Sequence, residues 1–381
     1  MTKHRVAALA GVAVLAAACS SPPQQGPAPT PFPEAAESSS AAAPDASAAP
    51  DGSFSVVATG DVLIHPALTE QAEADGHGKI DYRPLLAGIK PLISGADLGI
   101  CHLETPLAPE GGPYSGYPSF SAPPEIADAI KDTGYDTCST SSNHTIDQGA
   151  EGVTRTLAKL DDVGVKHTGS ARSAAEAAKP LILDVHGVKV AQVSYAFGFN
   201  GIKVPSGKPW LANQIDVDDV LAAARKAREA GAQVVIASLH WGVEYQHDPT
   251  AEQRSQAKKL LASDDIDLIV GHHAHVVQPF EKIGGKWVAY GLGNSVARHS
   301  DPRGDTEEGA AARFRFVRDG DRWKVDKAEY IPTLIKLDAP IRLIDLSTSP
   351  KSPQVTKALQ DTDKNILSLN ADKSGLTRPG K

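Results

Sequence analysis

The chain has 381 residues with a formal net charge of −8 at pH 7, and 41% of its residues are hydrophobic and 22% charged. This composition is typical of an ordinary globular protein that is large enough to bury a substantial core. The acidic balance argues against a nucleic-acid partner, because binding to a phosphate backbone requires a basic surface.

The first 18 residues have the features of a secretory signal peptide. Lys3 and Arg5 supply a short basic region, and the apolar run 6–18 that follows is too short to span a bilayer. The run ends in LAAAC, which resembles the cleavage box of bacterial lipoproteins and implies cleavage before Cys19 and lipidation of its thiol. We therefore expect an exported protein anchored by this lipid to the outer face of the cell membrane; a plain secreted protein is the alternative.

The segment 19–52 is predicted to be a disordered tether. It consists almost entirely of Ser, Pro, Ala, Gln, Gly and Glu, and Phe32 is its only large apolar side chain. Such a segment cannot bury enough apolar surface to offset the entropy lost on ordering. Folded structure is predicted to begin at FSVVATGD, 54–61, and to continue as one domain over 53–346.

Strand and helix patterns alternate through this domain. Buried strands are predicted at ADLGICHL, YDTCSTS, VKVAQVSYAF, AQVVIASLH, IDLIVGHH and WVAYGLG. Helices are predicted at EIADAIKDTG, GAEGVTRTLAKLDDVG, VDDVLAAARKAREAG and AEQRSQAKKLLAS. This alternation predicts an α/β layered domain, and the period-two pattern on both sides of Asp319 and Gly320 adds an antiparallel hairpin. Residues 347–381 are predicted to form a loose polar C-terminal tail with one weak helix near 356–361.

Two cysteines, Cys101 and Cys138, fall on predicted buried strands. Thiols on interior strands commonly just fill space. A disulfide has demanding geometry, so the sequence leaves open whether the two residues pair.

Polar residues with metal-binding chemistry follow the ends of five predicted strands. In open α/β sheets, ligands bind beyond the carboxyl ends of the strands, so these side chains are expected to share one rim. Each residue alone has a commoner explanation, as a turn, a helix cap or a solvated side chain. Grouped together they would be costly unless a divalent cation neutralised them. The candidates are Asp61, His65, His102, Glu104, Asn143, His144, Asp147, His240, His272, His273 and His275.

These donors are sufficient for two ions, with Glu104 or Asp61 bridging them. In an extended chain, alternate residues point to the same side, so His273 and His275 should both face the cavity while His272 faces elsewhere and has a lesser role. Two such ions activate water for attack on phosphorus, or on an amide carbonyl.

His144 is predicted to be the general acid at this site. It follows the candidate ligand Asn143 but is needed by neither ion, so it is placed to protonate the leaving oxygen. Asp147, three residues further on, is expected to orient the imidazole. Glu244, Tyr245 and Asn294 are expected to line the substrate cleft.

The chain contains six ordered blocks that resemble the CapA-like family of poly-γ-glutamate capsule-biosynthesis proteins, a branch of the calcineurin-like metallophosphoesterase superfamily. The blocks are GDVLIH, HLETPL, SSNHTIDQGAEG, SLHWGVEY, GHHAHVVQPFE and YGLGNS, and the resemblance runs from about Ser53 to about Ile331. It implies a four-layer α/β/β/α sandwich with mixed sheets. It also implies two divalent transition-metal ions, Mn, Fe or Zn.

The resemblance extends to individual residues. It implies that Glu104 replaces a bridging aspartate, that His144 is the general acid, and that the metal ligands are Asp61, Glu104, Asn143, His240, His273 and His275. His65 stands four residues after Asp61, where the superfamily has Asp-x-His, so a turn would have to bring it back as a ligand. His102 stands where the branch usually has Asn, and its role, ligand or spectator, stays open.

Three functions fit these features. The first is a dinuclear metal-dependent hydrolase of phosphoesters that is linked to poly-γ-glutamate or capsule biosynthesis. The second is a non-catalytic accessory component of a polymer synthesis or export complex, which would bind poly-γ-glutamate beside a membrane synthetase. The third is a metal-dependent amide hydrolase that trims polyglutamate.

Overall fold

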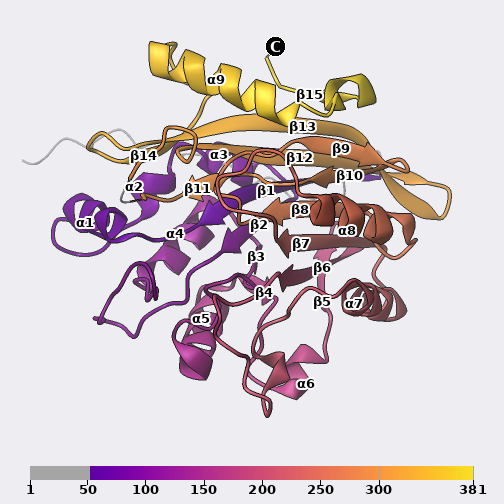
Figure 1. Ribbon diagram of the computed structural model, residues 1–381, viewed down its shortest axis with the longest axis horizontal. Coiled ribbons are helices and arrows are strands. Elements are labelled where there is room, and N and C mark those ends of the chain that lie inside the picture. Colours follow the sequence, from indigo (N-terminus) through magenta and orange to yellow (C-terminus); the bar gives the residue numbers. More distant parts are fainter. Residues whose placement is uncertain (1–51, 300, 381) are drawn as a thin grey trace, which may run out of the picture. The chain divides into compact units, whose positions relative to one another are not determined.

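The computed structural model describes residues 52–299 and 301–380 (Figure 1). The predicted signal peptide, Cys19 and nearly all of the predicted tether lie outside these residues. Within the described ranges, none of the helices combines the length and the apolar character that crossing a membrane requires.

The first sheet has nine strands, and it combines parallel strands with an antiparallel hairpin. Its order is β14-β13-β12-β1-β2-β3-β4, with β11 paired to β1 and β15 paired to β13. The bounds are Ser53–Val62 for β1, Leu98–Leu103 for β2, Thr137–Ser139 for β3, Lys166–Thr168 for β4, Asn294–Val296 for β11, Glu308–Asp319 for β12, Arg322–Lys336 for β13, Arg342–Asp345 for β14 and Leu376–Thr377 for β15.

The second sheet has six strands in the order β5-β6-β7-β8-β10-β9. Its four central strands are parallel, and β5 and β9 pair antiparallel at the two edges. The bounds are Leu181–Val185 for β5, Val188–Ala196 for β6, Val234–His240 for β7, Leu268–His272 for β8, Phe280–Ile283 for β9 and Lys286–Ala289 for β10.

Helices cover the outer faces of both sheets (Figure 1). Those packed on the first sheet are α1 (Pro66–Asp75), α2 (Arg83–Leu86), α3 (Lys90–Ser94), α4 (Glu125–Thr133) and α5 (Gly149–Val163). Those packed on the second are α7 (Val217–Glu229) and α8 (Ala251–Ala262). The remaining helical segments are α6 (Ala174–Ala177), α9 (Pro353–Ile366) and the short 3₁₀ turns η1 (Pro209–Leu211) and η2 (Ala371–Ser374).

The alternation of side chains along the strands creates the layers. On β1, Val56 and Ala58 face the second sheet, whereas Val57 packs under the helices of the first. On β7, Ile236 joins the core between the sheets, and Val235 packs against α7 and α8. Most of β1 and all of β7 are therefore buried on both faces, which explains their nearly continuous apolar sequences. The expected four-layer α/β/β/α sandwich with mixed sheets is confirmed.

The four helices predicted from the sequence all form, and their ends follow local chemistry. The helices α4 and α5 stop at Gly134 and Gly164, which adopt left-handed φ values of 105° and 75° that glycine tolerates best. At the start of α8, the Thr250 side chain accepts from the Gln253 backbone N–H in a capping box.

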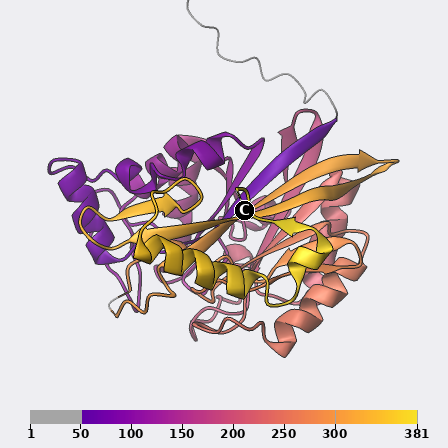
Figure 2. The same ribbon diagram turned by 90° about the horizontal axis from the view of Figure 1, so that it is seen from above.

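The prediction of a loose C-terminal tail is wrong. The helix α9 packs on the first sheet (Figure 2). Its Val355, Ala358 and Ile366 side chains are buried. The hydroxyl of Tyr330 on β13 donates to Asp363 Oδ1 over 2.7 Å, and β15 then pairs with β13. The weak helix predicted near 356–361 falls within α9, but the narrow apolar stripe did not indicate the full length of this helix or its packing on the sheet.

Cys101 and Cys138 form a disulfide that joins β2 to β3. They are register partners on adjacent parallel strands, with Cα atoms 4.5 Å apart. The sequence left open whether these residues pair, and in the structure they do, because the parallel register places the two side chains on the same face.

Replacing both cysteines by Ala is expected to lower the free energy of unfolding by about 3–4 kcal/mol, because the bond closes a loop of 37 residues in the unfolded chain. Denaturant unfolding measured with and without a reductant checks this. The wild type in reductant should approach the Cys101→Ala/Cys138→Ala variant, and equal stability of the oxidised and reduced wild type would contradict the prediction.

Candidate metal centre

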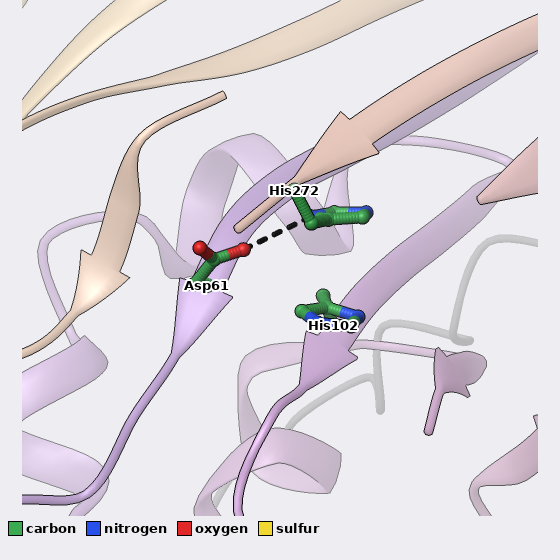
Figure 3. Close-up of side chains that lie close together, drawn as sticks. All are labelled: Asp61, His102 and His272. Atoms are coloured by element: carbon green, nitrogen blue, oxygen red, sulfur yellow. Dashed lines mark hydrogen bonds and ion pairs between the residues drawn. The ribbon is translucent and has the colours of Figure 1, made fainter. Parts of the chain in front are cut away.

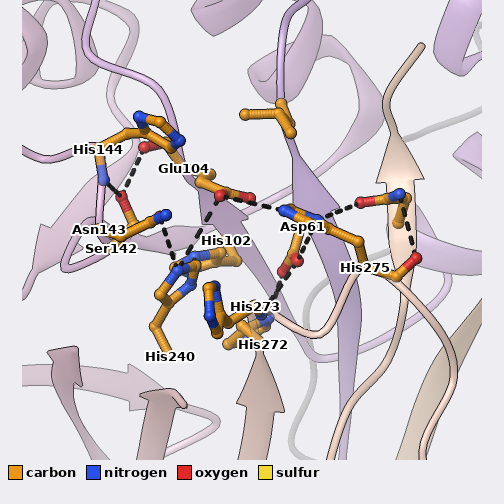
Figure 4. A network of polar contacts seen from close by, with 12 residues as sticks. Asp61, His102, Glu104, Ser142, Asn143, His144, His240, His272, His273 and His275 are labelled. Carbon is orange, nitrogen blue, oxygen red and sulfur yellow. Dashed lines mark hydrogen bonds and ion pairs between the residues drawn. The ribbon is translucent and has the colours of Figure 1, made fainter. Parts of the chain in front are cut away.

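The two sheets bring the carboxyl ends of five strands to one place. Asp61 at the end of β1 is the register partner of His102 on β2, and His240 at the end of β7 is the register partner of His272 on β8. β1 also contacts β8 across the two sheets. The predicted convergence of the strand-end residues is therefore confirmed, and the side chains form the network drawn in Figure 4.

Asp61 is fully buried among imidazoles. Its Oδ1 lies 3.2 Å from His272 Nδ1 (Figure 3), and its Oδ2 lies 3.3 Å from His275 Nδ1. The backbone N–H of His273 also donates to Oδ2 over 3.1 Å. Burial raises the pKa of Asp61, but the hydrogen bonds from His272 and His275 outweigh it and hold the pKa well below its usual value. Asp61 is thus a carboxylate that faces two histidines at once.

Glu104 is a buried carboxylate without a hydrogen-bond partner. It is 1% exposed, and neither of its side-chain oxygens makes a hydrogen bond to a described residue. Its Oε1 lies 3.7 Å from His275 Nε2 and 4.0 Å from His240 Nε2 (Figure 4). Burial raises the pKa of Glu104 well above its usual value. Carboxylates are rarely buried in this way unless a partner offsets the lost hydration, and a divalent cation is such a partner.

His240 and Asn143 form a second group of donors. His240 Nε2 lies 2.9 Å from Asn143 Oδ1, and its Nδ1 lies 2.9 Å from His102 Nε2. His102 Nδ1 in turn lies 2.8 Å from Ser139 Oγ. If His102 donates to Ser139 and His240 donates to His102, the Nε2 lone pair of His240 stands beside Asn143 Oδ1. That tautomer would present two acceptor atoms to a cation and would make His102 a residue that orients a ligand.

Three groups of donors among the described residues are compact enough to hold an ion, with their ligand atoms within 4.8 Å of one another. The groups are Asp61, His102 and His272; Asp61, Glu104 and His275; and Glu244, His273 and His275. Buried nitrogens without partners, His272 Nε2 and His273 Nδ1, add to the available lone pairs. The residues therefore fit divalent metal ions in chemistry and in spacing.

The reasoning for His272 is wrong, because the backbone is not extended there. His273 and His275 have φ values of 90° and 56°, in the left-handed region. Their rings still lie near each other, with centroids 6.1 Å apart, but the turn also leaves His272 against Asp61. His272 stacks on His102 with a centroid distance of 4.1 Å. It belongs to the centre as closely as the predicted ligands do.

His144 and Asp147 form the expected pair. His144 Nδ1 lies 2.7 Å from Asp147 Oδ2, and both side chains are almost fully buried. The same Oδ2 accepts from the backbone N–H of Phe120 over 2.8 Å, which fixes the carboxylate. The Phe120 ring packs edge-on against the imidazole at 4.7 Å. Because His144 also lines the cleft beside the centre, its Nε2 can exchange a proton there.

His65 lies apart from the three donor groups. Its Nδ1 is 3.1 Å from the Leu63 carbonyl oxygen, and its ring is 4.9 Å from that of His299. Burial lowers the pKa of His65 to about 4, so the imidazole is neutral. The turn into α1 directs it to the wall of the cleft and not to Asp61.

The cleft beside the centre has a volume of about 650 Å³. Glu244 and Tyr245 line it together with His144 and His275, as expected. Asn294, the third predicted cleft residue, is only 1% exposed and lies beneath His275, with its Oδ1 2.9 Å from His275 Nδ1. The assignment of Asn294 to the cleft is therefore wrong, because its amide is used to hold a ligand ring.

Some residues at the site were not predicted. His299 lies 3.3 Å from the Asn294 amide and lines the cleft, and the only sequence signal for it is its position five residues after Asn294. The Phe197 ring packs 4.5 Å from that of His273. Among the described residues, the exposed large apolar side chains all belong to loops bordering the centre; they are Tyr117, Phe197, Ile202, Val243 and Tyr245.

The chain is similar in sequence to several known proteins. The family model described as "Bacterial capsule synthesis protein PGA_cap" matches residues 55–299. The capsule biosynthesis protein CapA of Bacillus anthracis is 28% identical over 204 residues, which are 53% of this chain and 49% of that protein. The PGA biosynthesis protein CapA of Bacillus subtilis is 29% identical over 227 residues, 56% of this chain and 57% of that protein. The chain thus spans about half the length of these relatives.

Among solved structures, the calcineurin-like phosphoesterase YfkN from Bacillus subtilis superposes with a TM-score of 0.43 and 16% identity. The superposition covers 84% of this chain and 99% of that one.

Proposed function

The chain belongs to the bacterial capsule synthesis protein PGA_cap family, and from this premise we propose that it is a dinuclear metal-dependent hydrolase of the phosphoester type that acts in capsule or poly-γ-glutamate biosynthesis. One observation supports hydrolysis above all. Glu104 is a buried carboxylate whose oxygens accept no hydrogen bond from the described residues, and it stands between His240 and His275. A scaffold that only binds a polymer has no reason to maintain so costly a group.

The residues divide into two ligand sets around Glu104. Asp61, Glu104 and His275 would hold one ion, and Glu104, Asn143 and His240 would hold the other, with His273 beside them. When bound, such ions lower the pKa of a water and neutralise charge that develops on phosphorus. Mn, Fe and Zn all accept this combination of imidazole, amide and carboxylate.

The proton for the leaving group would come from His144. Asp147 holds the Nδ1–H of its ring, so Nε2 is directed away from that carboxylate and can carry the proton. Asn294 holds His275 in the same manner by accepting from Nδ1, which leaves Nε2 toward Glu104. Two histidines thus have their tautomers set by a neighbour, one for proton transfer and one for ligation.

The proposal places this centre outside the cell. The lipoprotein box ending at Cys19 would anchor the chain to the outer face of the membrane, and segment 19–52 would give the domain reach from it. The partner would be poly-γ-glutamate or a membrane synthetase complex. The family and the names of the two CapA relatives support this assignment.

Metal analysis of the purified full chain, combined with a screen on an aryl phosphate and a γ-glutamyl anilide, tests the proposal. We expect two transition-metal ions per chain and metal-dependent release of phosphate, lost on chelation and restored by the metal. Cleavage of the anilide alone would identify an amide hydrolase. A chain that binds two ions but hydrolyses neither substrate would support an accessory component, and a chain that binds no ion would refute the metal centre.

A further inference from the structure

Arg298 is held at the wall of the cleft. It lines the same cavity as His144 and His275, and its side chain is half-buried. Its backbone N–H points to His65 Nδ1 over 3.1 Å, and its Nη1 donates to the carbonyl oxygen of His299 over 2.5 Å. Both ends of the residue are therefore fixed, so the guanidinium has lost much of its conformational freedom before any ligand binds.

Arg298 forms no ion pair with any of the described residues, although Glu70 and Glu244 border the same cavity. Arg303, on the same rim, contrasts with it, because Arg303 lies 3.4 Å from Asp305 and its guanidinium lies over the Tyr245 ring at 4.8 Å. A guanidinium with one hydrogen bond to a carbonyl keeps most of its donors available for an oxyanion.

Aromatic side chains form part of the same cavity wall. Tyr117, Phe120 and Tyr245 line it together with Arg298, and Tyr117 is 80% exposed. Tyr245 has a φ of 63°, an uncommon conformation for a non-glycine residue, and its backbone N–H donates to the Ala274 carbonyl over 2.7 Å. The cavity thus combines faces for an apolar body with the guanidinium of Arg298, and it also contains Glu244 and His275 of the donor groups.

We propose that Arg298 binds a second anionic group of the substrate, a carboxylate or a phosphate, which the substrate carries apart from the bond that is cleaved. This inference rests on the proposed function for the position of that bond. It defines the substrate as an anion with at least two charged ends. The metal centre takes one end, and Arg298 takes the other and determines specificity.

Binding of non-hydrolysable probes tests this inference without requiring turnover. Calorimetry on the full chain would compare phenylphosphonate with its meta and para derivatives bearing a carboxylate or a second phosphonate. We expect at least one carboxylated or doubly phosphonated isomer to bind the wild type about 10- to 100-fold more tightly than phenylphosphonate. The better of the two series identifies the anion.

Variants assign the preference to Arg298. Arg298→Ala should reduce the ratio of affinities to about one, and Arg298→Lys, which keeps the charge but not the fork, should retain part of it. Arg318→Ala is the matched control and should keep the full ratio of affinities. Arg318 lies in the β12–β13 hairpin, and among the described residues its side chain donates only to the Gly320 carbonyl. A wild type without preference for any isomer, or a preference that survives Arg298→Ala, overturns the inference.

The outcome is separable from that of the proposed function. If the protein hydrolyses no phosphoester but still shows an Arg298-dependent preference among the phosphonates, the hydrolase fails and the anion site stands. If it hydrolyses phosphoesters but shows no preference, the hydrolase stands and the anion site fails.

Discussion

Replacing Glu104 by Gln is expected to change stability in opposite directions in the metal-loaded and metal-free protein. Without metal, burial forces Glu104 either to stay charged without a hydrogen-bond partner or to take up a proton, and an amide avoids both costs, so Glu104→Gln should raise the free energy of unfolding by about 1–3 kcal/mol. With metal, the same change removes the negative charge of the carboxylate that the proposed function assigns to both ions. Metal affinity should fall by roughly 100-fold or more, and the stabilisation that metal confers on the wild type should be largely lost.

Thermal unfolding with added metal and with a chelator measures both effects. The melting curves of wild type and variant should exchange their order between the two conditions. Glu308→Gln is a matched control, because Glu308 is also buried, with a pKa raised by burial to about 8, but lies on β12 away from the donor groups. Glu308→Gln should change the melting temperature by the same amount with added metal and with chelator. A Glu104→Gln variant that is less stable than wild type even in chelator would show that Glu104 is a structural carboxylate.

The expectation that ligands bind beyond the carboxyl ends of strands predicted the position of the centre, because the strands that carry its residues are parallel and buried on both faces. Their apolar sequences end where the polar residues begin, so the carboxyl edge of each sheet can be read directly from the chain. Asp61 and His240 are examples, since each is the last polar residue of a buried run. What that rule does not contain is the geometry of the turn that follows the strand.

The failures at the site arise from those turns. The left-handed φ values of His273 and His275 depend on contacts with Asp61 and Asn294, which are distant in sequence. The orientation of the Asn294 side chain could not be predicted from the sequence, because a polar residue next to a strand can face the cleft or, as here, a neighbouring side chain such as His275.

The failures in the fold have a related origin. The pairing of Cys101 with Cys138 depends on the register between β2 and β3, which no local pattern encodes. The short helices α1 to α3 begin with proline at N1 or N2 and bury few residues each, so their periodicity is weak. The helix α9 is stabilised mainly by the sheet on which it packs. In all of these cases tertiary contacts, and not the local sequence, select the structure.

Replacing His144 by Ala is expected to lower kcat by about 10²- to 10⁴-fold while the metal content is unchanged. The imidazole is not a member of the three donor groups, so removing it leaves the ions in place. Asp147→Asn should lower kcat less, because the ring remains but its Nδ1–H loses a charged acceptor at 2.7 Å. His167→Ala is a matched control, since His167 also contacts an aspartate, Asp161, at 3.2 Å but lies on β4 outside the centre. It should retain full activity.

The dependence on leaving group separates proton donation from a merely structural role. An acidic phenol departs as its anion and needs little help, whereas an alkoxide must be protonated as the bond to phosphorus breaks. The loss of rate in His144→Ala should therefore be small for a nitrophenyl phosphate and large for an alkyl phosphate, with metal stoichiometry measured on the same samples. An equal loss for both substrates would mean that His144 positions the substrate or the loop around Phe120, and the general acid would have to be sought elsewhere in the cleft.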